Sequence, residues 1–276
     1  MNDLLPDAPI GVFDSGVGGL TVAHAVARRL PHEHLLYFGD TAHLPYGDKS
    51  TAAIQAYSVK ICDWMLGRGA KVILIACNSA SASAYELVRE YVGQRALVVN
   101  VIDPAVAHVA EHHAGRTIGL IGTRRTVHSG VYRKKIQALG LSITLKSLAT
   151  PLLVPMIEEG FLRNKLSRYV ISEYLNNKQL DGVTALLLGC THFPLIKEEV
   201  VDYYAAQEPP RVVSVIDSSE IVAAAVHDQL AARGLLRTAG EGEKHFYVSD
   251  YTPSFEASTR LFFGRQVRLE VYPMWE

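Results

Sequence analysis

Two cysteines, Cys77 and Cys190, lie in matching surroundings 113 positions apart. Each directly follows an apolar run, 72–76 in one case and 185–189 in the other, and directly precedes two polar residues. Such runs are typical of buried strands in a parallel sheet, and ligands of α/β proteins bind beyond the carboxyl ends of these strands. The pattern therefore predicts two thiols facing one substrate, an arrangement suited to a two-sided proton transfer.

Polar side chains beside the two cysteines could serve the same chemistry. Asn78, Ser79 and Thr191 offer amide and hydroxyl donors for a substrate carboxylate, on which negative charge develops in the transition state. His192 follows Cys190 by two residues and could tune that thiol or carry its proton. A cysteine that begins a helix also lies among backbone N–H donors, which lower the pKa of a thiol.

Two other interpretations of the cysteines stay open. A free cysteine is often an inert core residue, which is how we interpret Cys62 within a helix-like stretch. Together with His192 and Asp14, the paired cysteines could surround a zinc ion, although they lack the local spacing typical of zinc sites. The duplicated placement favours the catalytic interpretation, without a metal.

A glycine-rich loop, DSGVGG at residues 14–19, joins a predicted strand to a predicted helix. Backbone N–H groups in such a turn can bind a phosphate or a carboxylate. The glycine spacing differs from the dinucleotide fingerprint and the loop lacks the lysine of a P-loop, which disfavours a nucleotide. An acid beside an anion site is costly, so Asp14 could contact an ammonium group or a proton-transfer partner, or it could cap the helix.

Two further loops could wall the same site. Pro45, Tyr46 and Gly47 form a shaped loop after an apolar run, although a plain turn has the same composition. Thr123 and Thr126 occupy a loop that corresponds to the one after residue 14, so their hydroxyls could meet the ligand from the opposite wall or cap a helix.

The sequence does not assign two charged features to the predicted site. Glu158 is an acid within the mostly apolar segment 155–160, and the sequence alone does not decide between a cleft and a solvated helix face. The densest basic run, 133–135, is expected on a solvated helix face.

The chain contains a duplicated α/β unit. Segments 10–15, 72–77 and 100–103 recur as 118–123, 185–190 and 214–217, at nearly equal offsets. In the first copy the expected strands are 10–14, 35–39, 72–76 and 97–102, and the expected helices are 19–30, 50–67 and 80–92. This alternation is typical of βαβ units with a parallel sheet.

We therefore expect two pseudo-symmetric α/β domains, each with a parallel sheet, and an active site in the cleft between them. The first domain comprises residues 1–103 plus 215–276, because the segment 244–275 should return to complete it. The second domain comprises residues 104–214.

Composition excludes several classes of protein. Of 276 residues, 49% are hydrophobic and 20% charged, as in soluble globular proteins, and the scattered basic residues with a net charge of −1 argue against a nucleic-acid surface. The chain shows no secretory signal pattern and no run of eighteen apolar residues, so we expect a cytoplasmic protein without membrane contact. In that reducing compartment, three cysteines without C-x-x-C pairing are expected to be free thiols.

Seven segments carry a family resemblance: IGVFDSGVGGLTV (10–22), Asp40 with PYG (45–47), ACNSASA (76–82), IGTRRTVHSGVY (121–132), VPMIEEG (154–160), LLGCTHFPLI (187–196) and FYVSD (246–250). With these motifs the chain resembles the cofactor-independent glutamate racemases of the aspartate/glutamate racemase superfamily. One departure is Ser79, where the family usually has threonine, and the hydroxyl is kept.

The resemblance implies interconversion of L- and D-glutamate without pyridoxal phosphate or metal, supplying D-glutamate for peptidoglycan, by a homodimer. It implies that Cys77 takes the proton from the D-enantiomer and Cys190 from the L-enantiomer. Asp14 would support the first thiol, and His192 and Glu158 the second. The residues that it assigns to substrate binding are Asp14, Ser15, Pro45, Tyr46, Gly47, Cys77, Asn78, Ser79, Thr123, Thr126, Cys190, Thr191 and His192.

Other functions fit parts of the sequence. The same scaffold could racemise aspartate or isomerise a dicarboxylate such as maleate, because function follows from the site and not from the architecture. A phosphate- or nucleotide-binding module would use the glycine-rich loop, and a metal-dependent hydrolase would use the cysteines as ligands. A pyridoxal enzyme would need a Schiff-base lysine, and no lysine occupies a motif position.

Overall fold

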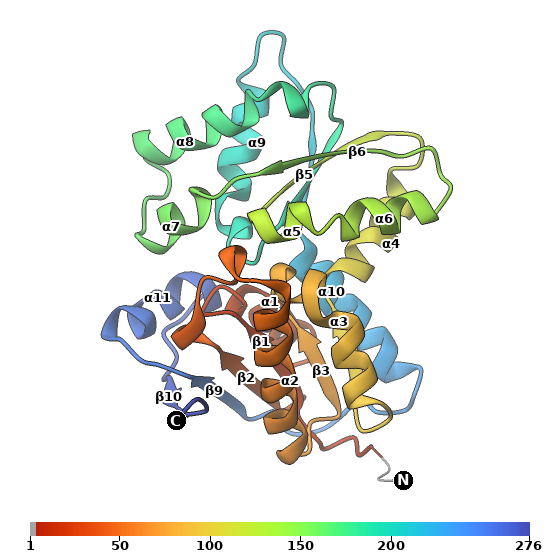
Figure 1. The fold of residues 1–276 in the computed structure, drawn as a ribbon, viewed down its shortest axis with the longest axis vertical. Helices are drawn as coiled ribbons and strands as arrows, with labels where there is room; N and C mark the ends of the chain where they lie inside the picture. The colour runs from red at the N-terminus through yellow and green to blue at the C-terminus, as the bar shows by residue number, and fades with distance from the viewer. Residues whose placement is uncertain (1–3) are drawn as a thin grey trace.

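Two all-parallel sheets organise the chain in the computed structural model, which describes residues 4–276. One sheet has six strands and the other has four, and Figure 1 shows them in the lower and upper halves of the molecule. The predicted fold class, two α/β domains with parallel sheets, is confirmed. Residues 1–3 of the predicted first domain lie outside the described residues.

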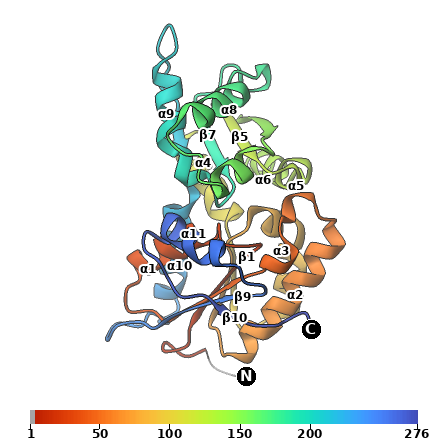
Figure 2. The ribbon, with the colours of Figure 1, turned by 90° about the vertical axis from the view of Figure 1, so that its left-hand side faces the viewer.

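The first sheet combines strands from both ends of the chain. In spatial order its strands are β10 (Glu270–Val271), β9 (Lys244–Val248), β2 (Leu35–Gly39), β1 (Ile10–Asp14), β3 (Val72–Ile75) and β4 (Leu97–Asn100). Its helices are α1 (Leu20–Arg29), α2 (Thr51–Gly67), α3 (Asn78–Val92), α10 (Ser218–Ala231) and α11 (Pro253–Phe263). In Figure 2, α1 and α10 lie on one side of this sheet and α2 and α3 on the other.

Each face of the first sheet has its own hydrophobic core. In β1, Val12 joins a cluster with residues of α1 and α10, whereas Phe13 joins a cluster with residues of α2 and α3. In β3, Leu74 and Ile75 divide in the same way. Because successive side chains of a strand point to opposite faces, a sheet covered on both faces needs apolar residues at every position. This double burial explains the continuous apolar runs that predicted the strands.

The second sheet repeats the strand order of four strands of the first, β2-β1-β3-β4. Its strands, in the corresponding order, are β6 (Thr144–Ala149), β5 (Thr117–Gly122), β7 (Ala185–Gly189) and β8 (Ser214–Ile216). Its helices are α4 (Ile102–His112), α5 (Arg124–His128), α6 (Val131–Ala138), α7 (Leu153–Glu158), α8 (Lys165–Leu175) and α9 (Lys197–Ala205). Thus β3 and β7, which precede the two cysteines, occupy equivalent places in their sheets.

The chain crosses between the two sheets at two capped turns. Asn100 ends β4, and its Oδ1 accepts hydrogen bonds from the N–H groups of Ile102 (2.8 Å) and Asp103 (2.9 Å). At the second crossing, Asp217 caps α10 by accepting from Ser219 N at 2.8 Å. Asp103 lies inside the first turn of α4 whereas Asp217 precedes α10, so these two aspartates are not structurally equivalent.

The crossing points refine the division into two domains. Strand β8 spans the predicted boundary between residues 214 and 215, and it pairs with β7 as far as Ile216. Strand β9 pairs with β2, and β10 pairs with β9, so the segment after α10 joins the first sheet. We propose to keep the two-domain division, with the return to the first domain placed after Ile216.

Helix α3 begins at Asn78, two residues before the predicted start at residue 80. Its N-cap is Cys77, whose Sγ accepts a hydrogen bond from Ala80 N at 3.4 Å. Cysteine is not among the preferred capping residues, so the sequence carries no cap signal that would fix the start at Asn78. The cap places the Cys77 thiol at the positive end of a helix.

A buried ion pair joins three segments of the first domain. Lys71 Nζ lies 2.6 Å from Glu33 Oε2, and both side chains are almost fully buried. Lys71 also donates to the carbonyl groups of Pro6 and, at 2.9 Å, Leu235. Glu33 Oε1 accepts from Arg237 N at 2.8 Å. The start of the chain and the segment after α10 are therefore anchored at the same point.

We predict that Lys71→Ala lowers the free energy of unfolding by about 3–5 kcal/mol, because it leaves the Glu33 carboxylate buried without its partner. Urea unfolding followed by circular dichroism measures this change. Arg89→Ala is the matched control: its pair with Glu86, 2.8 Å long, is about two-thirds exposed, and its loss should cost no more than about 0.5 kcal/mol. Equal effects of the two substitutions would contradict the prediction.

Candidate active site

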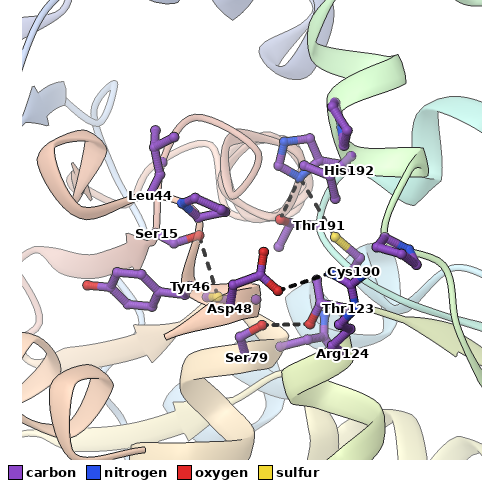
Figure 3. A pocket seen from close by; sticks show the side chains of 18 of the residues that line it. Ser15, Leu44, Tyr46, Asp48, Ser79, Thr123, Arg124, Cys190, Thr191 and His192 are labelled. Atoms are coloured by element: carbon purple, nitrogen blue, oxygen red, sulfur yellow. Dashed lines mark hydrogen bonds and ion pairs between the residues drawn. The ribbon is translucent and has the colours of Figure 1, made fainter. Parts of the chain in front are cut away.

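A cavity of about 250 Å³ opens between the two sheets, at the carboxyl ends of their central strands (Figure 3). The loops that follow β1, β3, β5 and β7 all contribute to its wall. The predicted site residues that line it are Ser15, Pro45, Tyr46, Gly47, Cys77, Asn78, Ser79, Thr123, Glu158, Cys190, Thr191 and His192. The structure therefore brings both cysteines to one cavity.

Two predicted site residues do not reach the cavity wall. Asp14 is fully buried at the end of β1, and Thr126 is buried behind Thr123. The wall also contains residues that we did not predict: Gly16, Leu44, Asp48, Arg124, Thr150, Pro151, Val154 and Pro155. All three cysteines are free and buried, with Cys62 inside the core of the first domain.

The Cys77 thiol has surroundings that keep it protonated. Its Sγ lies 3.7 Å from Ser15 Oγ and 3.4 Å from Ala80 N. Burial raises the pKa of Cys77 to about 12, and the negative charge of Asp14 adds to this, while the Ala80 and Ser15 hydrogen bonds oppose it. The expectation that the helix start lowers the pKa of this thiol is therefore wrong for Cys77: burial outweighs the N–H donors, and the thiol keeps its proton at neutral pH.

Cys190 belongs to a chain of three interacting side chains. His192 Nδ1 lies 3.8 Å from Cys190 Sγ, and His192 Nε2 lies 2.9 Å from Glu158 Oε1. Burial alone would lower the pKa of His192, but the hydrogen bonds with Cys190 and Glu158 and their negative charges raise it to about 10. A charged imidazole donates through both nitrogens, so it stabilises a thiolate on one side and a carboxylate on the other.

Asp14 lies beneath the glycine-rich loop and holds it in place. Its Oδ2 accepts hydrogen bonds from Gly16 N (3.1 Å) and Gly19 N (3.0 Å), and among residues 4–276 its buried Oδ1 has no partner. Burial raises the pKa of this carboxyl, although the charge of His192 and the loop N–H donors lower it. Since Asp14 already binds these N–H groups, the loop does not offer them to a phosphate.

The glycine-rich loop contacts the loop at 190–192 directly, across the boundary between the two halves. A Cβ on Gly18 would lie 2.3 Å from His192 Cε1 and 2.8 Å from Thr191 Oγ1, so only glycine fits there. Beside this contact, Thr21 Oγ1 donates to the carbonyl of Thr191 at 2.8 Å. The two loops are therefore held in register by the packing of the Thr191 and His192 side chains against Gly18 and by the Thr21 hydrogen bond.

A group of hydroxyls forms another part of the wall. Ser79 Oγ and Thr123 Oγ1 lie 2.9 Å apart, across the boundary between the halves (Figure 3). Thr123 also caps α5 by accepting from Thr126 N at 3.2 Å, and it donates to Thr126 Oγ1 at 3.1 Å. Thr123 therefore has both of the roles considered for it, cap and cavity wall, whereas Thr126 supports it from behind.

The loop at 45–47 is supported from below by a buried carboxylate. The Tyr46 ring is turned away from the cavity (Figure 3), and its hydroxyl donates to Asp40 Oδ2 at 2.6 Å. Asp40 Oδ1 also accepts from Ser249 Oγ and from Trp275 Nε1, each at 2.8 Å. The end of the chain thus helps to position a wall of the cavity.

An ion pair crosses the rim of the cavity. Arg124 Nη1, from the second half, lies 3.3 Å from Asp48 Oδ1, from the first, and more than half of each side chain is exposed (Figure 3). Arg125 beside it donates to the carbonyl of Lys49. Charged residues are ordinary on protein surfaces, so the sequence gives no indication that these side chains lie at the rim of a cavity.

The structure bears on the zinc interpretation of the cysteines and on the expectation that the protein makes no membrane contact. Among residues 4–276, no group of three or more His, Cys, Asp or Glu side chains is arranged to hold a metal ion, so the zinc interpretation has no geometric support. In the same part of the chain, every helix is too short or too polar to cross a lipid bilayer.

Comparison with known proteins identifies the family. The sequence profile of the Asp/Glu/Hydantoin racemase family matches residues 20–226. The chain belongs to this family. It is 38% identical to the glutamate racemase of Neisseria gonorrhoeae, with 96% of each chain covered, and 37% identical to that of Geobacter metallireducens, with 94% of each covered.

Solved structures of this racemase family agree with the sequence comparison. Glutamate racemase from Francisella tularensis in complex with D-glutamate has a TM-score of 0.90 and 35% identity, covering 98% of this chain and 99% of that one. Glutamate racemase from Thermus thermophilus in complex with β-chloro-D-alanine has a TM-score of 0.84 and 38% identity, covering 97% and 98%. The predicted resemblance to glutamate racemases is confirmed.

For this member of the racemase family, we predict that iodoacetamide modifies Cys190 about tenfold or more faster than Cys77 at pH 7.5, because only thiolates react and Cys77 holds its proton. The exposed fractions of the two residues are nearly equal, 7% and 6%, so access does not explain such a difference. Mass spectrometry of the digested protein measures both rates, with buried Cys62 as the unreactive control. Faster modification of Cys77 would contradict the prediction.

We also predict that His192 in the free protein stays charged well above pH 6.5 and titrates near pH 10. Any stability that this shift contributes is complete below pH 6.5, the unfolded value, and is lost as the pH rises through about 10. Glu158→Gln should lower the pKa of His192, because it removes the negative charge beside Nε2. Histidine ¹⁵N chemical shifts report the titration.

Glu159→Gln is the matched control for this titration, since the neighbouring acid is exposed and makes no hydrogen bond to His192. Titration of His192 near pH 6.5 in the unaltered protein, or equal effects of the two substitutions, would show that Glu158 does not hold the imidazole charged.

Proposed function

We propose that this protein racemises glutamate by proton transfer between two cysteines. The observation that carries the proposal is the position of Cys77 and Cys190, which line one cavity and follow equivalent strands of two sheets. The substrate is supported by relatives named glutamate racemase at 37–38% identity and by the Francisella tularensis complex with D-glutamate.

The proposed reaction needs one base and one acid on opposite faces of the α-carbon. Starting from L-glutamate, the Cys190 thiolate takes the α-proton, so that an S–H bond forms while the C–H electron pair spreads toward the α-carboxylate. Cys77 then gives its thiol proton to the opposite face of the α-carbon, which yields D-glutamate and leaves Cys77 as the thiolate. The reverse reaction starts from that state.

Neighbouring groups support this starting state. The N–H of the charged His192 imidazole, held by Glu158, stabilises the thiolate of Cys190 before the reaction. The raised pKa of Cys77 keeps a proton ready on the other side. Asp14 contributes through its charge, which raises the pKa of Cys77, and through the loop that it holds.

We assign substrate binding to the polar groups of the cavity wall. Asn78, Ser79 and Thr191 offer donors to a carboxylate of glutamate, and the positive end of α3 lies beside them. The wall is completed by Ser15, Pro45, Tyr46, Gly47 and Thr123. Asp14 and Thr126 act from behind this wall, by positioning other groups.

We further propose, on the basis of the resemblance to glutamate racemases, that the protein works in the cytoplasm as a homodimer and supplies D-glutamate for peptidoglycan. The reaction as written uses only groups of the chain, with neither pyridoxal phosphate nor metal.

We predict that either enantiomer of glutamate, incubated with the protein in D₂O, yields the other enantiomer carrying deuterium at the α-carbon. Cys77→Ala and Cys190→Ala should each lower the racemisation rate by about a thousandfold or more, because each removes one of two proton carriers. Circular dichroism of glutamate measures inversion, and ¹H NMR measures the exchange. Cys62→Ala, which changes a cysteine outside the cavity, is the control and should keep most of the activity.

The absence of both inversion and exchange in the unaltered protein would refute the proposed function. The same assay with L- and D-aspartate, and ¹H NMR of the isomerisation of achiral maleate, decide between glutamate and the other substrates considered. Faster turnover of one of these would keep the two-thiol chemistry and replace the substrate.

A further inference from the structure

A buried tyrosine contacts the cavity wall from the opposite half of the molecule. Tyr132 lies in α6, close to the second sheet, and its hydroxyl donates to Oδ1 of Asn78 at 2.8 Å. Asn78 is the first residue of α3, close to the first sheet, and lines the cavity. Both side chains are almost completely buried, at 1% and 4% exposure.

This hydrogen bond decides which end of the Asn78 amide faces the cavity. The amide has one acceptor oxygen and one NH₂ group with two donors. The oxygen is occupied by Tyr132, whereas among residues 4–276 no group accepts a hydrogen bond from Nδ2, which keeps access to solvent. Two unpartnered N–H donors beside the cavity suit a carboxylate, which has only acceptors.

The tyrosine hydroxyl donates its proton to the oxygen of this amide. Burial raises the pKa of Tyr132, so its hydroxyl keeps the proton that it donates to Oδ1. A hydrogen bond to the amide oxygen also polarises the N–H bonds at the other end and strengthens them as donors. Without the hydroxyl, the amide is free to turn and to present its oxygen to the substrate, where it would repel a carboxylate.

We propose that Tyr132 is a positioning residue that aims Nδ2 of Asn78 at a carboxylate of the substrate. Because the two residues belong to different halves of the molecule, the carboxylate site is complete only when the halves are as close as they are in this structure. The inference rests on the proposed function, since it takes glutamate as the substrate.

The test is the kinetics of Tyr132→Phe, which keeps the ring and removes the hydroxyl. We expect the KM for both L- and D-glutamate to rise about tenfold, the loss expected for one hydrogen bond to an ion, with a smaller change in kcat. A purely structural defect would instead reduce the folded fraction, lowering the apparent kcat at unchanged KM. The thermal midpoint of each variant is measured alongside.

The matched control is Tyr203→Phe, which removes the same kind of bond elsewhere. Tyr203 donates to Oδ1 of Asn176 at 2.5 Å on the exposed surface, outside the cavity. We expect its KM and kcat to equal those of the unaltered protein. A rise in KM for both tyrosine variants would overturn the proposal.

A double-substitution cycle shows whether Tyr132 acts through Asn78. In an Asn78→Ala background, Tyr132→Phe should cause no further rise in KM, because the amide that it positions is gone. A racemase with unchanged KM in Tyr132→Phe, or an equal rise in both backgrounds, overturns this inference and leaves the proposed function intact. A protein that racemises no glutamate before any substitution overturns both.

Discussion

The site depends on one close contact, in which the backbone of Gly18 packs against the side chains of Thr191 and His192. Gly18 lies so close to the opposite loop that any added carbon would overlap it. The loop cannot yield easily, because Asp14 binds its N–H groups from below and Tyr37 donates to the Gly16 carbonyl at 2.7 Å. The separation of the two sides of the cavity is therefore set where the His192 and Thr191 side chains pack directly on the backbone of Gly18.

The repeated strand order gives the two cysteines equivalent positions, but their neighbouring side chains differ. Each follows the equivalent strand of its own sheet, yet Cys77 is coupled to the buried acid Asp14, whereas Cys190 faces the imidazole of His192. The first environment raises the pKa of its thiol, and the second places a charged imidazole N–H beside its sulfur. The two cysteines therefore have equivalent positions in the two sheets but neighbours of opposite charge. This difference suits a reaction that needs an acid and a base at once.

Features set by local rules could be predicted from the sequence. Apolar runs predicted the strands, because both faces of each sheet are buried, and the ends of those strands placed Cys77 in the site. Features set by contact between distant segments could not. Nothing local indicates that Asp14 lies beneath its loop, that Arg124 meets Asp48 at the rim, or that Tyr132 reaches across to the other half.

The order of the strands along the chain also determines when, during synthesis, the walls of the cavity can form. The second sheet is built from one continuous stretch of chain, 117–216, but the first sheet receives β9 and β10 from the end. During synthesis the backbone N–H and C=O groups along one edge of β2 stay unpaired until β9 emerges, an exposed edge of the kind that invites wrong pairing. Because Trp275 supports Asp40 beneath the wall of the cavity, this wall gains its full support only after residue 275 has left the ribosome.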